Sequence, residues 1–236
     1  MVSRLDRLTK VATPDRSPDR PMGQSPVHSD ASGRDRKVYL IGFSATGKSH
    51  SGRLAAQELG ADFVDMDRLI VRREGKQISE IFEAAGEDEF RRIERELLRE
   101  LADEPGQQVI STGGGVPVDA RNRDVMAESG LTIRLMASPE TIYARINRTG
   151  SRTPRRTCRQ GAVRPMLAAS ESEETSIEAI QSLLVDREEA YAAAADVAID
   201  TEGREPPDVA SEIVARIGQS ASDMSKITPG KTEDTQ

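Results

Sequence analysis

The sequence predicts an α/β fold, in which helices cover both faces of a five-stranded parallel sheet within a single domain. Short apolar runs alternate along the chain with stretches of helical periodicity, an order typical of a parallel sheet with crossover helices. The chemically distinctive motifs also follow strand ends, where such sheets bind ligands. We expect this domain at 37–218, between disordered tails at 1–36 and 219–236 that are too polar to offset their ordering entropy.

Five apolar runs are predicted as strands, and the continuous run that ends near Gly42 is the clearest of them. The predicted strands are residues 37–43, 61–67, 107–112, 131–137 and 196–201. The intervening periodicity predicts helices at 48–59, 68–75, 78–86, 87–104, 119–129, 138–147, 176–194 and 207–217. Ser138 is expected to cap its helix, with Pro139 at the first helical position.

Composition excludes several classes of protein. The net charge of −7 argues against a general nucleic-acid binder, and no apolar run is long enough to span a membrane. The N-terminus lacks the apolar stretch of a secretory signal. Cys158 is the one cysteine, so the chain has no internal disulfide, which fits a reducing cytosol. We therefore expect a cytoplasmic monomer with no nucleic-acid or membrane partner.

The segment 42–49 matches the phosphate-binding pattern G-x-x-x-x-G-K-[ST] between a predicted strand and a predicted helix. Lys48 is expected to neutralise the β- and γ-phosphates of a nucleotide, and the Ser49 hydroxyl to bind Mg²⁺. Ala45 stands where glycine is common, which requires a loop that tolerates a Cβ. His50 replaces a commoner threonine, and we interpret it as a helix residue rather than a catalyst. The predicted nucleotide-binding residues of this segment are Ala45, Thr46, Gly47, Lys48, Ser49 and His50.

Two aspartates close the second predicted strand, in the order Asp65, Met66, Asp67. A kinase needs a carboxylate near its acceptor hydroxyl, so one aspartate is expected on the magnesium side and the other as base and hydroxyl ligand. By strand alternation Met66 is expected to point the other way. The alternative is that Asp67 only caps the next helix, which accounts for one aspartate but not for two.

Three further features are weaker from sequence alone. The triplet of Gly113, Gly114 and Gly115 predicts close approach of a ligand to the backbone, although a sharp turn would use one or two of these glycines. Arg91 has Glu94 three residues later, so a surface ion pair is the simplest interpretation. Periodicity does not single out Arg187 in its helix either.

Over about residues 37–218 the chain resembles the shikimate kinase family. The matching segments occur in the family's order: the phosphate loop, DMD, GEDEFRRIE, TGGG, VRPML and DREEAYAAAADVAIDT. The combination of GEDEFRRIE with TGGG is much more specific than the phosphate loop, which many enzyme classes share.

The resemblance implies a P-loop kinase fold and Mg²⁺-dependent transfer of the γ-phosphoryl group of ATP to the 3-hydroxyl of shikimate. It also implies that shikimate is bound by Asp67, Arg91, Arg187 and the glycine triplet, and that Asp65 lies on the magnesium side. Two guanidinium groups could then hold the acid, while Asp67 orients and deprotonates the hydroxyl. Phe82 and Phe90 match apolar residues near the substrate, with core packing as an equal alternative.

An arginine-rich segment at about 148–175 matches the family's lid, and Arg164 with Pro165 matches its Arg-Pro element. The resemblance implies that Arg164 binds the ATP phosphates and, with Lys48, stabilises transferring charge. The other arginines of the segment are read as a solvated loop. Arg204 matches a position beside the adenine.

Three other functions stay open. One is a P-loop kinase acting on gluconate or a nucleoside monophosphate, although a nucleotide acceptor needs no paired aspartates. Another is a non-catalytic P-loop paralogue that binds nucleotide without transfer, since Ala45 and His50 depart from the usual loop. The weakest is RNA binding through the arginine-rich segment.

Overall fold

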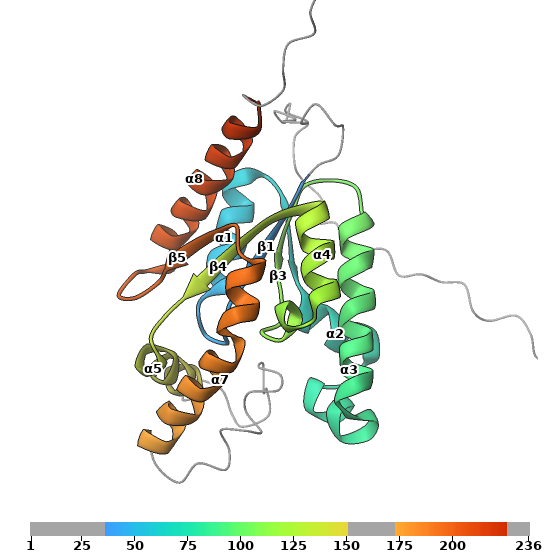
Figure 1. Cartoon of the computed structure of the whole chain (residues 1–236), viewed down its shortest axis with the longest axis vertical. Helices are drawn as coiled ribbons and strands as arrows, with labels where there is room; N and C mark the ends of the chain where they lie inside the picture. The colour runs from blue at the N-terminus through green and yellow to red at the C-terminus, as the bar shows by residue number, and fades with distance from the viewer. Residues whose placement is uncertain (1–35, 151–172, 226–236) are drawn as a thin grey trace, which may run out of the picture.

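The structure is a computed structural model that describes residues 36–150 and 173–225. Five parallel strands form its sheet in the order β2-β3-β1-β4-β5, with β1 at the centre (Figure 1). The strands are β1 (Lys37–Ile41), β2 (Asp62–Asp65), β3 (Gln108–Ser111), β4 (Gly130–Met136) and β5 (Val197–Asp200). The predicted five-stranded parallel sheet is therefore confirmed.

Helices follow the strands in the predicted alternation. They are α1 (Lys48–Leu59), α2 (Met66–Glu74), α3 (Ile78–Asp103), α4 (Ala120–Ser129), α5 (Pro139–Gly150), α7 (Glu173–Ala194) and α8 (Pro206–Ser225), with a 3₁₀ turn η1 (Val116–Val118). Gly86 inside α3 has non-helical angles (φ 80°, ψ 176°), so the predicted division at this glycine is confirmed. The Ser138 hydroxyl accepts the Thr141 N–H at 3.2 Å, as expected of the cap of α5.

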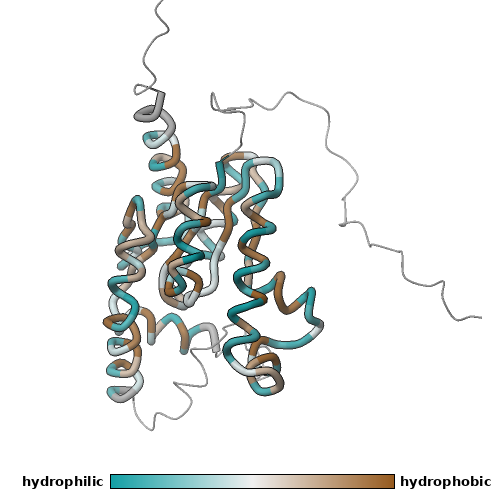
Figure 2. The backbone as a smooth tube through the Cα atoms, turned by 45° about the vertical axis from the view of Figure 1, so that its right-hand side comes forward, coloured by the Kyte–Doolittle hydropathy of each residue, from teal (hydrophilic) through white to brown (hydrophobic). Residues whose placement is uncertain are grey.

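The two faces of β1 carry separate apolar cores. Val38 and Leu40 pack with residues of α1 and α8, whereas Tyr39 and Ile41 pack with residues of α2, α3, α4 and α7. Figure 1 shows α8 and α3 on opposite sides of the sheet, and Figure 2 shows hydrophobic and hydrophilic turns alternating along the outer helices. The helices that contribute to these two cores therefore bury one side against the sheet or against a neighbouring helix, whereas α5 packs against α7.

The loops after β1 and β3 leave the sheet side by side, because these strands are neighbours. Leu40 is paired with Ser111 in the parallel ladder. One residue further, the Thr112 N–H donates to the Leu40 carbonyl at 3.1 Å. The phosphate-loop segment 42–49 and the glycine triplet thus meet at the carboxyl edge of the sheet, where the sequence predicts ligand binding.

The paired aspartates lie differently from the prediction. Strand β2 ends at Asp65, and Met66 and Asp67 already belong to α2. Asp65 is the residue that caps this helix, since its Oδ1 accepts the Arg68 N–H at 3.1 Å. The strand predicted at 61–67 is therefore present but ends two residues earlier than predicted, and the alternative of capping by Asp67 is wrong. Capping by Asp65 starts the helix early, and this places Met66 fully in the core.

Several predictions fall outside the part of the chain that is described. These cover residues 1–35 and 226–236 of the expected tails, and 151–172 of the expected lid.

Helices α7 and α8 are longer than predicted, because α7 begins at Glu173 and α8 continues to Ser225. Among the described residues, no helix is both long enough and apolar enough to cross a bilayer.

Candidate active site

The loop between β1 and α1 bends through three residues with positive φ. Gly42 and Gly47 have φ angles of 134° and 100°, and Ala45 has 62°. A Cβ on Gly42 would lie 2.3 Å from the Leu135 carbonyl oxygen, so only glycine fits beside β4. Ala45 adopts the left-handed conformation that residues with a Cβ rarely take. The loop therefore accommodates a Cβ at this position, as predicted. The segment therefore has the tight, glycine-dependent path of a phosphate-binding loop.

Lys48 is held inside this loop by the loop's own backbone. Its Nζ donates to the carbonyl oxygens of Gly42 and Phe43, each at 2.7 Å, and the side chain is buried. Burial lowers the pKa of Lys48 to about 8, while the carboxylates of Asp67 and Asp65 oppose that shift. The ammonium group is thus fixed at the loop and close enough to both aspartates to feel their charge.

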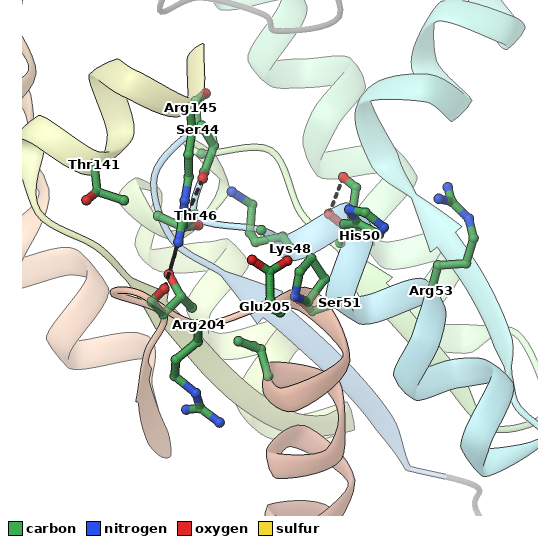
Figure 3. Close-up of a pocket in the computed structure, with 18 of the residues that line it drawn as sticks. Ser44, Thr46, Lys48, His50, Ser51, Arg53, Thr141, Arg145, Arg204 and Glu205 are labelled. Carbon is green, nitrogen blue, oxygen red and sulfur yellow. Dashed lines mark hydrogen bonds between the residues drawn. The ribbon is translucent and has the colours of Figure 1, made fainter. Parts of the chain in front are cut away.

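Lys48 lines a cleft of about 770 Å³ that runs from the phosphate loop to the connection between β5 and α8. Figure 3 shows Arg145 and Glu205 around this cleft, with Arg145 reaching it from α5. The Arg145 guanidinium donates to the Ala45 carbonyl at 3.3 Å and to the Thr201 carbonyl at 2.6 Å. Arg145, which the sequence analysis missed, therefore ties the phosphate loop to the end of β5.

Two further predicted nucleotide residues, Arg204 and His50, also line the cleft. The Arg204 side chain extends away from the loop (Figure 3) and donates to the carbonyl oxygens of Asp200 and Asp208 at 3.1 and 3.0 Å. His50 is exposed at the start of α1. Both positions remain predictions for a bound nucleotide.

Asp67, at the start of α2, turns its carboxylate toward the glycine triplet. Its Oδ1 would lie 2.9 Å from a Cβ placed on Gly113. Burial raises the pKa of Asp67 to about 7, the carboxylates of Asp65 and Glu94 add to the rise, and Lys48 opposes it. A carboxylate with this pKa is well matched to accepting a proton near neutral pH.

Arg91 also points toward the glycine triplet, and a buried carboxylate orients its side chain. Arg91 Nη1 lies 2.7 Å from Glu94 Oε2, and the Glu94 side chain is only 2% exposed. The ion pair between Arg91 and Glu94 that the sequence favoured is therefore confirmed, but its expected place on the surface is wrong, because Glu94 is in the core. Burial raises the pKa of Glu94, and Arg91 opposes that rise. A signal existed: Glu94 stands between Phe90 and Leu97 at helical spacing, a charged residue on an apolar stripe.

The outer glycines of the triplet make room for these charged side chains. A Cβ on Gly113 would lie 2.7 Å from Glu94 Oε1, and a Cβ on Gly115 would lie 2.2 Å from Arg91 Nη1. Neither glycine has a positive φ, so a left-handed turn is not what requires them. A larger residue at either position would displace these charged side chains.

The middle glycine faces α7 instead. A Cβ on Gly114 would meet Arg187 Nη1 and the Tyr191 hydroxyl at ordinary contact distances of 3.6 Å each. The Tyr191 hydroxyl donates to the Gly114 carbonyl at 2.7 Å. The Arg187 guanidinium also lies over the Phe43 ring, 5.5 Å from its centroid. Arg91 and Arg187 therefore approach the triplet from two different helices.

Ser49 and Asp65, the predicted magnesium ligands, line the same cleft as Lys48 and Asp67. The Ser49 hydroxyl is 3.2 Å from the Ser111 hydroxyl, so it is already turned toward β3. No three His, Cys, Asp or Glu residues come together as a metal site within 36–150 and 173–225. One hydroxyl and one carboxylate suit Mg²⁺, which usually takes few protein ligands and completes its octahedron with phosphates and water.

Most of the predicted site residues thus gather at one edge of the sheet. Arg164 lies outside the described residues, so its role stays a prediction. Phe82 and Phe90 stack with centroids 4.8 Å apart, and Phe90 is buried. The residues brought together around the loop and the triplet are Lys48, Ser49, Asp65, Asp67, Arg91, Gly113, Gly114, Gly115 and Arg187.

Comparison with known proteins gives a consistent result. The sequence model of the family described as Shikimate kinase matches residues 44–218. A shikimate kinase of Geobacter sulfurreducens is 43% identical over 178 residues, which cover 75% of this chain and 88% of that protein.

Two solved structures share the fold. Shikimate kinase from Acinetobacter baumannii in complex with shikimate has a TM-score of 0.66 and 30% identity, covering 79% of this chain and 94% of that one. A gluconokinase from Sinorhizobium meliloti has a TM-score of 0.50 at 15% identity, covering 82% of this chain and 98% of that one. The second likeness concerns the fold alone.

Proposed function

The chain belongs to the shikimate kinase family, and on that premise we propose that it transfers the γ-phosphoryl group of ATP to the 3-hydroxyl of shikimate. One observation carries this proposal beyond family membership. A single cleft contains both Lys48 of the phosphate loop and Asp67, a carboxylate poised to accept a proton. Phosphoryl transfer needs a base or orienting group at the attacking hydroxyl and a cation at the nucleotide phosphates, with the attacking and leaving oxygens roughly in line.

The acceptor is held by groups of complementary charge. Arg91 and Arg187 approach the triplet from α3 and α7, so together they can hold one carboxylate in a fixed fork. Asp67 receives the proton of the attacking hydroxyl and fixes its direction. Lys48 stabilises the charge that develops on the transferred phosphoryl group, and Arg164 is proposed to assist it.

Mg²⁺ is part of the proposal, with the Ser49 hydroxyl and Asp65 as the residues that would hold it. When bound, the ion would neutralise charge on the phosphates. Asp65 also caps α2, so this residue links the metal site to the helix that carries Asp67. We further propose a monomeric, cytoplasmic enzyme without nucleic-acid or membrane partners, in keeping with the net charge of −7.

The acceptor can be identified by ADP release from ATP and Mg²⁺ in the presence of shikimate, gluconate or a nucleoside monophosphate. Of these three acceptors, we expect turnover with shikimate. A base of raised pKa and two arginines fit an acid that carries hydroxyls rather than a nucleoside monophosphate, and membership of the shikimate kinase family favours shikimate over gluconate. Preferred turnover of gluconate or of a nucleotide would contradict the proposal. Nucleotide binding without turnover of any acceptor would favour a non-catalytic paralogue.

We expect the kcat/KM for shikimate, at saturating ATP and Mg²⁺, to rise with pH and to level off above about pH 7. Asp67 has a pKa near 7 in the acceptor-free protein, so below that pH it is protonated and cannot take the hydroxyl proton. Initial rates from about pH 5.5 to 8.5 measure this limb. If kcat/KM for shikimate stayed constant down to about pH 5.5, Asp67 would not be the titrating base.

Gly114→Ala is expected to leave the Tm close to that of the wild type and to raise the KM for shikimate about tenfold or more. The protein itself leaves room for a methyl group, since the nearest atoms are 3.6 Å away. A substrate bound against this backbone would meet that methyl group. Thermal melts and shikimate titrations separate the two effects. Unchanged KM would show that no ligand approaches Gly114.

A further inference from the structure

Arg134 is a nearly buried arginine that lies outside the site described above. It belongs to β4, next to the central strand, and its side chain is only 11% exposed. A guanidinium cannot lose its charge in a protein, so burial is tolerated only where partners compensate. The nature of these partners shows what Arg134 holds in place.

The first partner is Glu188 on α7. Arg134 Nη1 and Nη2 donate to Glu188 Oε1 and Oε2 at 2.8 and 2.6 Å, a bidentate pair that fixes distance and orientation together. This hydrogen bonding lowers the pKa of Glu188, so the carboxylate stays ionised at neutral pH. Glu188 directly follows Arg187 in the sequence, so the pair anchors the turn of α7 that carries an acceptor-binding guanidinium.

The second partner is Tyr191, one turn further along α7. The Arg134 guanidinium lies over its ring, 5.3 Å from the centroid, and Tyr191 is 1% exposed. The Tyr191 hydroxyl in turn donates to the Gly114 carbonyl at 2.7 Å. Arg187 Nη1 and the Tyr191 hydroxyl both lie 3.6 Å from a Cβ placed on Gly114, so the two side chains reach the same glycine. Burial raises the pKa of Tyr191, and the Arg187 guanidinium opposes the rise. Arg134, Glu188 and Tyr191 form a unit that we call the Arg134 clamp.

We propose that Arg134 is a positioning residue for the acceptor, which acts through Glu188 and Tyr191 to set the distance between Arg187 and the glycine triplet. One buried side chain thereby connects β4, α7 and the loop after β3, three segments that are far apart in the sequence. The inference rests on the proposed function, since it assigns to the clamp the placement of groups that bind shikimate. Arg134, Glu188 and Tyr191 are proposed to act on the loop after β3, whereas the phosphate loop is reached through the contact of Arg187 with Phe43. Shikimate binding should therefore depend on the clamp more than nucleotide binding does.

The test compares Arg134→Met and Glu188→Gln with Glu189→Gln, which removes the same charge from the next, exposed residue of α7. We expect the KM for shikimate to rise about tenfold in Arg134→Met and about threefold to tenfold in Glu188→Gln, because misplacement of a binding group by about 1 Å is costly. The KM for ATP should change less than about twofold in all three variants. Glu189→Gln should match the wild type.

A double variant separates positioning from mere stability. Because Arg134 is proposed to act through Glu188, adding Glu188→Gln to Arg134→Met should raise the KM for shikimate no further. The proposal would be overturned if the two substitutions multiplied each other's effect on the KM for shikimate. Equal rises in the KM for ATP and for shikimate would also overturn it. A change in Tm without a change in the KM for shikimate would assign Arg134 a structural role only.

Hydrogen exchange provides a readout that does not depend on the identity of the acceptor. In the ligand-free protein, Arg134→Met should speed amide exchange in the part of α7 around Arg187 and leave α1 unchanged. If the wild type fails to use shikimate, the proposed function is lost, but this comparison still decides whether the clamp holds α7. Unchanged exchange in α7 would refute the clamp even in an active kinase.

Discussion

Asp67→Asn is expected to lower kcat with shikimate by about 10²- to 10⁴-fold, the range attributed to a general base, while ATP still binds. The asparagine keeps the shape of the side chain and a hydrogen-bonding oxygen, but it cannot accept a proton near neutral pH. Initial rates at saturating substrates measure the loss, and calorimetric titration with ATP measures binding. Near-normal turnover would remove Asp67 from the mechanism.

Asp62→Asn is the matched control for this variant, because Asp62 is an exposed aspartate at the start of β2. It should behave as the wild type.

Asp67→Asn should also be more stable than the wild type above about pH 7. The folded protein raises the pKa of Asp67 from 3.8 to about 7, so folding is opposed increasingly as pH rises through that window, and the asparagine has no such penalty. A higher Tm with lost turnover would identify the carboxylate as a functional group kept against stability.

Lys48→Met is expected to weaken ATP binding and to lower kcat/KM for ATP by about 10²- to 10³-fold or more, as for loss of one preorganised charge on a transition state. The variant removes the ammonium group from the loop and leaves the Gly42 carbonyl without its 2.7 Å donor. A small fall in Tm should therefore accompany the loss of activity. Nucleotide titration and initial rates measure both effects.

The control for this variant is Lys76→Met, which removes an exposed lysine between α2 and α3. Its kinetics should match the wild type. If Lys48→Met bound ATP with unchanged affinity and turned over at a similar rate, the segment 42–49 would not be the nucleotide site.

The sequence predicts the sheet well because the signals for its strands are local. The apolar run that ends near Gly42 and the helix at 48–59 lie where predicted, since a buried strand, a glycine-rich loop and an amphipathic helix each have their own pattern. The split of α3 at Gly86 is also local, because glycine alone favours the φ of 80° found there. Family resemblance then assigns the site residues that periodicity leaves unmarked, such as Arg187.

Features that depend on contacts between distant segments were not predictable. Strand alternation predicts Asp65 and Asp67 at one strand end, whereas Asp67 lies in α2 and its carboxylate faces Gly113, which is far away in the sequence. The sequence predicts close approach of a ligand at the glycine triplet, but it does not reveal that a Cβ on Gly115 would overlap the Arg91 guanidinium. The apolar stripe of Phe90 and Leu97 indicates that Glu94 is buried, but no local pattern reveals that its carboxylate lies beside Gly113.

Identification of the product tests the central claim most directly, that Asp67 and the phosphate loop serve one transfer reaction. ATP, Mg²⁺ and shikimate are incubated with the enzyme, and the products are analysed by proton–phosphorus correlation NMR. We predict ADP together with one phosphate ester on the 3-hydroxyl of shikimate. ADP accompanied only by inorganic phosphate, or phosphorylation at another hydroxyl, would show that the cleft does not aim that hydroxyl at the nucleotide.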